Sequence, residues 1–527
     1  MAAADEDEKT DAIQESEAGS TDSRTLVTSA LLLAMAVCSL EQTVVSTAMP
    51  SIIATLGGLE IYPWVFSAYL LASTVTTPLY GKLADRLGRK RVLLFGLLMF
   101  GLGSMLSGLA QSMPQLIAAR VVQGLGAGAV GPIVVTMLGD LFTLRERARV
   151  QALFSVVWGV SSLAGPYLGG RLTDGLSWRW VFYVTVPFAV VSAWILVRHV
   201  REHVEAHDNK PIDWAGVVLL SLGSSLLLAA VLRGNGPSPA LGVVLFLSGL
   251  GLLGLFAWNE HRAADPLLPV DLILTPNILA SVIGSFMVGA LLFGIDTYVP
   301  LYVQGVQGGT ATMAGRNLTP LFVSWSISVV IAAWVVRPLG FRMTAVAGSS
   351  LLTLGFFALM AGSTRPEWAS AIFFGSMVVI GLGMGPTSLS YTLDVQNSVE
   401  HNRRGTATSV VMFARMMGGA LGVGLLGAAL GVELSYRLGD LTSIDVAAAL
   451  RPETHARLSP QVLAVVQESL GLSLRDTFLE MAVMSALALI VSFGLRGGHA
   501  DAHATNGRIP GASGAQERID LAAALEH

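Results

Sequence analysis

Two ionisable residues, Glu41 and Arg120, stand inside long apolar runs of the sequence. Glu41 lies nine residues before Pro50, about 13 Å along a helix axis, and Arg120 lies six residues after Pro114, about 9 Å. Helices bounded by these prolines would therefore hold the two side chains at similar depths, close enough to pair. A carboxyl group beside a guanidinium in an apolar environment can bind and release a proton. We treat the pair as a candidate proton-coupling site, and a static interhelical ion pair is the alternative.

Other polar residues in the apolar runs extend this candidate site. Gln123 lies three residues after Arg120 and shares its helix face, and Tyr69 is an aromatic candidate for a ligand pocket. Asp296 is either a coupling and recognition group or a carboxylate solvated at the membrane surface. Arg415 lies ten residues into its run, about 15 Å deep, and we expect it to pair across helices for structure. The candidate substrate-binding residues are Glu41, Tyr69, Gln123 and Asp296, and those for proton coupling are Glu41, Arg120 and Asp296.

The composition shows what kind of element must position these residues. The 527 residues are 53% hydrophobic and only 13% charged, whereas soluble globular chains carry about 25% charged residues. Apolar runs of about 20 residues, each long enough to cross a bilayer as a helix, recur from about residue 25 to about residue 495. The sequence predicts an all-α polytopic membrane protein with about fourteen transmembrane helices.

Several classes of function are excluded by what the chain lacks. The net charge of -4 gives no basic field for nucleic acid, and the single cysteine, Cys38, excludes an intrachain disulfide. There is no GxxxxGK[ST] phosphate-binding loop, no GxSxG elbow and no cluster of His and Cys ligands. We expect no enzyme activity, no cofactor and no metal.

Basic residues fall in alternate loops and predict the orientation in the membrane. They cluster in the loops at 82–91, 145–149 and 198–210, whereas the short loops 49–61 and 111–114 contain no Lys or Arg. Because cytoplasmic loops are enriched in basic residues, both termini are predicted to lie in the cytoplasm.

An internal repeat divides the apolar runs into two halves. Three pairs of positions recur at separations of 257, 252 and 255 residues: Gly124 to Gly128 with Gly381 to Gly385, Leu87-Gly88 with Leu339-Gly340, and Glu41 with Asp296. The prediction is two six-helix halves, which in transporters enclose a substrate site near the membrane midplane. The predicted regions are an N-terminal half at 25–200, two inserted transmembrane helices at 201–265 and a C-terminal half at 266–496.

Three further segments are predicted to lie outside the membrane. Residues 1–24 are acidic and polar, which favours a disordered cytoplasmic tail. Within an outer loop at 431–473, Ser459-Pro460 predicts the start of a short surface helix. Residues 497–527 are predicted to form a second cytoplasmic tail, which ends in LAAALEH, a sequence that resembles the remnant of an affinity tag.

Two glycine-containing motifs suit a conformational gate. In Gly81 to Lys90 (GKLADRLGRK), the glycines allow a tight turn, while Asp85 and basic neighbours such as Arg89 can bridge adjacent helix ends. In Gly165 to Gly170 (GPYLGG), the proline removes a helix hydrogen bond and the glycines leave a bendable surface. The candidate gate residues are Gly81, Asp85, Arg89, Gly165, Pro166, Gly169, Gly170 and Arg415.

These motifs resemble those of the major facilitator superfamily. The loop at Gly81 to Lys90 resembles its cytoplasmic loop signature, Arg120 to Gly126 its RxxQGxG signature, and Gly165 to Gly170 its antiporter signature, with Ser161 in place of a glycine. Leu40 to Val45 resembles the first-helix signature of the fourteen-helix drug:proton antiporter family, with Glu41 where that family usually has Asp. The fold type is therefore expected to be that of multidrug and quaternary-ammonium exporters.

The resemblance implies proton-coupled export of small lipophilic or cationic compounds across a bacterial inner membrane, as in antibiotic resistance by multidrug efflux. The expected partners are protons, a lipophilic small molecule and the lipid bilayer, and the expected state is a monomer. Two alternatives stay open: a lipid or lipid-precursor transporter of the same fold, and a membrane scaffold or receptor that transports nothing. Altered envelope lipids on deletion would indicate the former alternative, and altered dye retention would indicate efflux.

Overall fold

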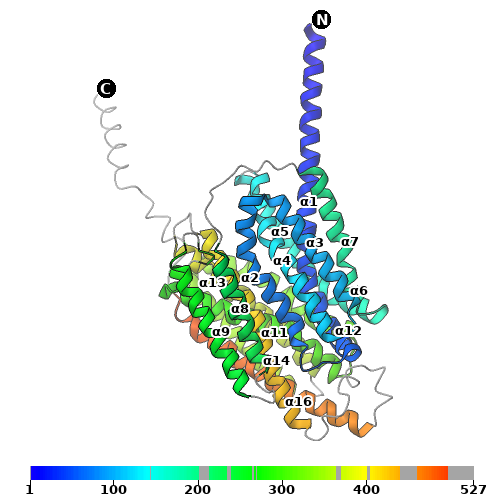
Figure 1. The fold of residues 1–527 in the computed structure, drawn as a ribbon, viewed down its shortest axis with the longest axis vertical. Coiled ribbons are helices and arrows are strands. Elements are labelled where there is room, and N and C mark those ends of the chain that lie inside the picture. Colours follow the sequence, from blue (N-terminus) through cyan, green and yellow to red (C-terminus); the bar gives the residue numbers. More distant parts are fainter. Residues whose placement is uncertain are drawn as a thin grey trace, which may run out of the picture.

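Long helices make up nearly all of the protein in a computed structural model, which contains no strand in the part of the chain that it describes (Figure 1). The structure describes residues 2–142, 144–200, 213–233, 239–263, 266–268, 270–363, 369–399, 404–438 and 460–495. The predicted tag remnant lies outside these residues. The helices are α1 (Ala2–Leu56), α2 (Pro63–Leu87), α3 (Arg89–Leu109), α4 (Met113–Leu141), α5 (Leu144–Gly175), α6 (Trp180–Tyr183), α7 (Thr185–His199), α8 (Trp214–Arg233), α9 (Pro239–Glu260), α10 (Val270–Ile273), α11 (Pro276–Gly305), α12 (Ala311–Gly362), α13 (Ala369–Asn397), α14 (Arg404–Leu438) and α16 (Pro460–Ser492).

Ten helices of the described residues are long and apolar enough to cross a membrane. One of them, α12, has 52 residues, which would span about 78 Å if it were straight. Its chain turns at Gly340, where φ is 77°. Ser324 on the first arm and Gly348 on the second both approach the segment from Gly381 to Thr387 of α13, so α13 packs against both arms. The turn divides α12 into two arms, residues 311–339 and 341–362, each long enough to cross a membrane.

Two helices continue into segments predicted to lie outside the membrane. Residues 2–24 belong to α1, which extends beyond the other helices in Figure 1, and the cytoplasmic tail predicted for this segment stays a prediction. The segment is rich in Ala and Glu, which are strong helix formers, and its acidic residues suit a helix N-terminus. The segment from Pro460 does begin a helix, as predicted, but α16 continues without a break to Ser492. Within the predicted outer loop, residues 439–459 lie outside the described chain.

The reason for the long α16 lies in the spacing of its apolar residues. Val466, Leu470, Leu474 and Phe478 recur every fourth residue and are fully buried. No proline interrupts the helix after its first residue, Pro460. The same buried stripe therefore continues from the predicted outer loop, which ends at residue 473, into the rest of α16.

The predicted repeat is confirmed at two places. Gly88, between α2 and α3, has φ of 94°, and its counterpart Gly340 has φ of 77°, so both halves turn on a glycine at the same position. A side chain would be strained in this left-handed region.

The glycine-rich helices α4 and α13 also occupy equivalent places. Gly126 of α4 packs against the backbone of α3 at Phe100, while Gly124 packs against α2 at Tyr69. In the second half, Gly383 of α13 packs against the second arm of α12, while Gly381 packs against the first arm. Each half therefore has one central helix wedged between two others.

The two inserted helices form a hairpin beside the bundle. Helices α8 and α9 pack against each other, and α8 also contacts α2 and α14 (Figure 1). Asp213 links the start of α8 to the end of α9. Its Oδ2 accepts a hydrogen bond of 2.5 Å from Asn259 of α9, and its Oδ1 accepts one of 2.9 Å from the N–H of Gly216 of α8. The hairpin therefore covers the side where α2 of one half meets α14 of the other.

The close approach at Gly126 generates a matched stability test on one helix. A methyl group at Gly126 would overlap the backbone of Phe100, whereas nothing lies within 4 Å of the same position at Gly131. We expect Gly126→Ala to lower stability by about 1–3 kcal/mol, because neither backbone can move away without disturbing the packing. Gly131→Ala should be neutral or stabilising. The measurement is the thermal unfolding midpoint in detergent, and equal midpoints for the two variants would contradict this account of the packing.

Candidate functional site

Glu41 of α1 and Arg120 of α4 form a buried ion pair through Glu41 Oε1 and Arg120 Nη1. Their side chains are 0% and 1% exposed, so neither charge reaches solvent. The pairing predicted from their matched depths is confirmed. Because removing one partner from a buried pair leaves an uncompensated charge, α1 and α4 are tied to each other at this point.

Arg120 is held by three further groups. Its Nε donates to the carbonyl oxygen of Val65 at 3.2 Å, and its Nη1 donates to Gln123 Oε1 at 2.7 Å. The guanidinium also lies over the ring of Tyr69, 4.1 Å from the centroid. Sequence spacing predicted the contact with Gln123, but not those with α2. The guanidinium is therefore fixed whether or not Glu41 is ionised.

A polar chain leads from Gln123 to the far side of the first half. Gln123 Nε2 donates to Ser104 Oγ of α3 at 3.3 Å, and Ser104 Oγ shares a hydrogen bond of 2.8 Å with Thr185 Oγ1 of α7. All three side chains are buried. Sequence analysis missed Ser104 and Thr185, because serine and threonine are common in membrane helices and their spacing gives no signal.

Two oxygen atoms at this site have unused hydrogen-bonding capacity. Glu41 Oε2 and Tyr69 Oη are buried and make no hydrogen bond with the described residues. The Tyr69 hydroxyl lies beside Glu41. A carboxylate with one oxygen paired and the other open has a position at which a proton or a ligand group can bind.

Asp296 of α11 brings a second carboxyl group to α1 from the other half. It lies next to Ser46, five residues after Glu41, and its Oδ1 makes no hydrogen bond among the described residues. The side chain is 4% exposed, and α11 continues for nine residues beyond it to Gly305. The alternative of a solvated surface carboxylate is therefore wrong, because protein covers this group.

Hydrogen bonds join the two halves at one end of the bundle, where α5 ends and α12 begins; we call this the distal end. Asp174 of α5 accepts hydrogen bonds from the N–H groups of Ala311 and Thr312, at 3.1 and 2.8 Å, and from Thr312 Oγ1 at 2.6 Å. Gln304 of α11 donates to the carbonyl oxygen of Thr47 of α1 at 2.9 Å. The helix N-terminus favours the negative charge of Asp174.

A second set of contacts closes the distal end between α2 and the second half. Ser67 Oγ donates to the carbonyl oxygen of Ala420 of α14 at 2.7 Å. Tyr62 and Tyr298 meet edge to face, with ring centroids 6.2 Å apart. The two halves are thus in contact here through polar groups and rings that can separate without breaking either half.

The predicted gate glycines of α5 lie on two adjacent faces. Gly165 and Gly169 face α1 at Thr43 and Thr47, whereas Gly170 faces the start of α12. The carbonyl of Pro166 lies against Gly315 of α12. Helix α5 therefore touches its own half on one side and the other half on the next, with little side-chain bulk between the backbones.

The predicted gate loop differs from its expected geometry. Gly81 lies inside α2, and the turn occurs at Gly88, because only Gly88 falls between two helices. Asp85 is exposed. Lys90 Nζ makes the bridge to a neighbouring helix end, donating to the carbonyl oxygens of Val197 and Val200 at 3.0 and 2.5 Å.

Arg415 does not form the cross-helix pair that its depth predicts. Its Nε and Nη2 atoms are buried and make no hydrogen bond with the described residues. The backbone of α14 at Arg415 packs directly on Gly289 of α11. The nearest acid along α11, Asp296, lies seven residues farther on, about 10 Å along the axis, so this level of α11 offers no acidic partner.

Comparison with known proteins agrees with this architecture. The family model of the Major Facilitator Superfamily matches residues 31–423. Multidrug transporter protein MdtP of Bacillus subtilis is 35% identical over 432 residues, which cover 81% of this chain and 79% of that protein. Multidrug resistance protein 3 of the same organism is 32% identical over 423 residues, which cover 78% of this chain and 81% of that protein.

A solved structure shares the fold at much lower sequence identity. The inward-facing, unoccupied structure of a bacterial homologue of the human lysosomal transporter Spinster superposes with a TM-score of 0.66 at 16% identity, covering 90% of this chain and 98% of the other. This likeness concerns the fold. The family match and the two relatives show that the chain belongs to the major facilitator superfamily and is a multi-pass membrane transporter rather than an enzyme.

Proposed function

We propose that the protein is a proton-coupled antiporter that exports small lipophilic or cationic compounds, of the fourteen-helix drug:proton type. The observation that carries the proposal is the buried carboxylate of Glu41, with one oxygen on Arg120 and the other without a partner. The relatives named multidrug transporter and multidrug resistance protein support the export role.

The proposed number of spans follows from the helices of the bundle. The ten candidate helices include α12, whose two arms count as two spans. Helices α2, α5 and α16, with 25, 32 and 33 residues, are each long enough to cross a membrane. Counting them gives fourteen, with the first residues of α1 and the N-terminal ends of α3 and α5 on the cytoplasmic side.

Glu41 is the proposed proton carrier because its environment tolerates both of its charge states. When Glu41 is ionised, Arg120 neutralises it. When Glu41 binds a proton, Arg120 keeps its bonds to Val65 and Gln123 and its contact with the Tyr69 ring. When Glu41 is protonated, the Arg120 guanidinium therefore still has hydrogen-bond acceptors and a ring contact. A buried guanidinium without such contacts would be costly.

Asp296 is the proposed second acidic group, facing α1 from the other half. A cation bound between the halves would find the open oxygen of Glu41, the hydroxyl of Tyr69 and the open oxygen of Asp296. Gln123, already bonded to Arg120 and Ser104, would position the arginine rather than bind substrate directly. Competition between a proton and a cationic substrate for the same carboxylates would couple the two movements.

The proposed gate is the distal end, which faces the outside of the cell. The contacts of Asp174 with α12, of Gln304 with Thr47 and of Ser67 with Ala420 would have to break for substrate to leave there. The glycines of α5 would allow this helix to slide between α1 and α12. Arg415 would gain a partner in the rearranged state.

Replacing Glu41 with Gln should abolish the coupling of transport to protons without abolishing substrate binding. In proteoliposomes, Glu41→Gln should abolish substrate movement driven by a pH gradient, because the side chain can no longer carry a proton. The variant should retain exchange of labelled for unlabelled substrate, which needs no net proton transfer. Glu60→Gln, which changes an exposed acid, is the matched control and should behave like wild type. Gradient-driven transport that persists in Glu41→Gln would show that the ion pair is only structural.

Removing the carboxylate of Asp174 should open the distal end. With its three hydrogen bonds to α12 lost, Asp174→Ala should raise the labelling rate of a cysteine placed at Thr47 by at least about tenfold, given the strength of charge-assisted hydrogen bonds. The reagent is a membrane-impermeant maleimide, in a Cys38→Ser background. Glu60→Ala, which removes an exposed acid between α1 and α2, is the control. An unchanged labelling rate would exclude Asp174 as a latch.

A further inference from the structure

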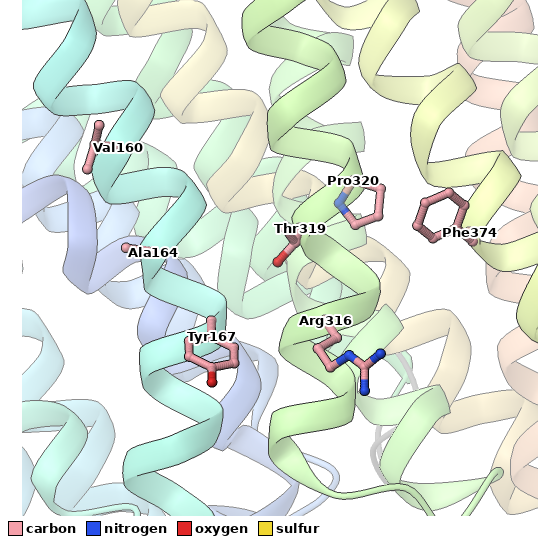
Figure 2. A pocket seen from close by; sticks show the side chains of 7 residues that line it. All are labelled: Val160, Ala164, Tyr167, Arg316, Thr319, Pro320 and Phe374. Atoms are coloured by element: carbon pink, nitrogen blue, oxygen red, sulfur yellow. The ribbon is translucent and has the colours of Figure 1, made fainter.

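A groove opens on the outer surface of the bundle where the two halves meet along α5 and α12. Its volume is about 560 Å³, and Figure 2 shows side chains from α5, α12 and α13 along it. The side chains of Val160, Tyr167 and Phe374 are 58%, 47% and 55% exposed, so the groove faces whatever surrounds the protein. The lining residues are Val160, Ala164, Tyr167, Arg316, Thr319, Pro320 and Phe374.

The groove runs from the distal end of the bundle toward its middle. Arg316 lies five residues after the start of α12, about 7.5 Å along the axis, and Val160 lies fifteen residues before the end of α5, about 22 Å. In a bilayer with a hydrocarbon core of about 30 Å, Arg316 would lie near the headgroups of one leaflet and Val160 among the acyl chains.

Arg316 is a cation that the described residues leave unneutralised. It is exposed and forms no ion pair with them. Asp174, the acid on this part of α5, already accepts three hydrogen bonds from α12. Thr319 and Tyr167 add hydroxyl groups to the lining, and the rest of the lining is apolar. This arrangement is complementary to a molecule with an anionic head and an apolar tail.

We propose that the groove binds an anionic phospholipid of the distal leaflet, with its phosphate on Arg316 and an acyl chain along Val160, Ala164 and Pro320. Guanidinium groups bind phosphate with two parallel hydrogen bonds, and the bilayer itself supplies the ligand. The site does not depend on which substrate the protein transports.

The bound lipid would connect the two halves. Val160, Ala164 and Tyr167 belong to α5, whereas Arg316 and Pro320 belong to α12. Beside the groove, the carbonyl of Pro166 packs against Gly315, so the lipid would cover a contact between backbones of different halves. It would therefore favour the conformation in which the distal end is closed.

The test uses photoactivatable lipids with identical acyl chains and different headgroups. The full-length protein is placed in phosphatidylcholine nanodiscs with a small fraction of phosphatidylglycerol probe or, separately, phosphatidylcholine probe, and labelled peptides are identified by mass spectrometry. For wild type, we expect the phosphatidylglycerol probe to label residues 160–167 and 316–320 about fivefold more than the phosphatidylcholine probe.

Three variants identify the cause of the labelling. Arg316→Gln should remove the preference for phosphatidylglycerol, and Arg316→Lys should retain most of it, because the positive charge remains. Arg337→Gln, which removes an exposed arginine near the other end of the first arm of α12, should leave labelling of the groove unchanged. Equal labelling by the two probes in wild type, or an unchanged preference in Arg316→Gln, would overturn the proposal.

Discussion

The buried ion pair between Glu41 and Arg120 is the constraint on which the first half of the molecule depends. Two charges without solvent are tolerated only when their geometry is fixed and their remaining hydrogen-bonding groups are occupied. Arg120 donates hydrogen bonds to Val65 and Gln123 and lies over the ring of Tyr69, so most of its hydrogen-bonding and charge interactions are provided by the protein. The close helix packing at Gly124 and Gly126 brings α2, α3 and α4 near enough for these contacts to form.

The junction between the halves is built on a different principle. Inside each half, glycines place backbones in direct contact. The distal junction between halves has such contacts only between α5 and α12 among those described above, and its other contacts include hydrogen bonds that Asp174 accepts and that Gln304 and Ser67 donate. Such bonds can exchange for water or for other partners at small net cost, while dry backbone contacts cannot. This difference suits two rigid halves that move relative to each other. Helix α5 takes part in both kinds of contact.

The features that could be predicted from the sequence depend on the depth of a residue along its helix or on the spacing of glycines. The positions of Glu41 and Arg120 relative to their prolines predicted their pairing, and the glycine pattern of α4 and α13 predicted the repeat. Depth alone failed for Arg415, because pairing also requires an acid at the same level of the facing helix.

Contacts that depend on helix rotation, and the positions at which helices end, could not be predicted from the sequence. The bonds of Gln304 to a backbone carbonyl and of Asp174 to backbone N–H groups have backbone partners, which leave no mark in the residue pattern. The length of α1 and of α16 was also missed, since hydropathy marks the membrane crossing and not the end of the helix.

The central claim is that Glu41 exchanges a proton for substrate, and it is tested most directly by following the proton itself. Purified wild-type protein in weakly buffered detergent is mixed with a lipophilic cation while the pH is recorded. The account predicts that protons appear in solution on addition of the cation, in proportion to the amount of protein. Binding of the cation with no release of protons would contradict it.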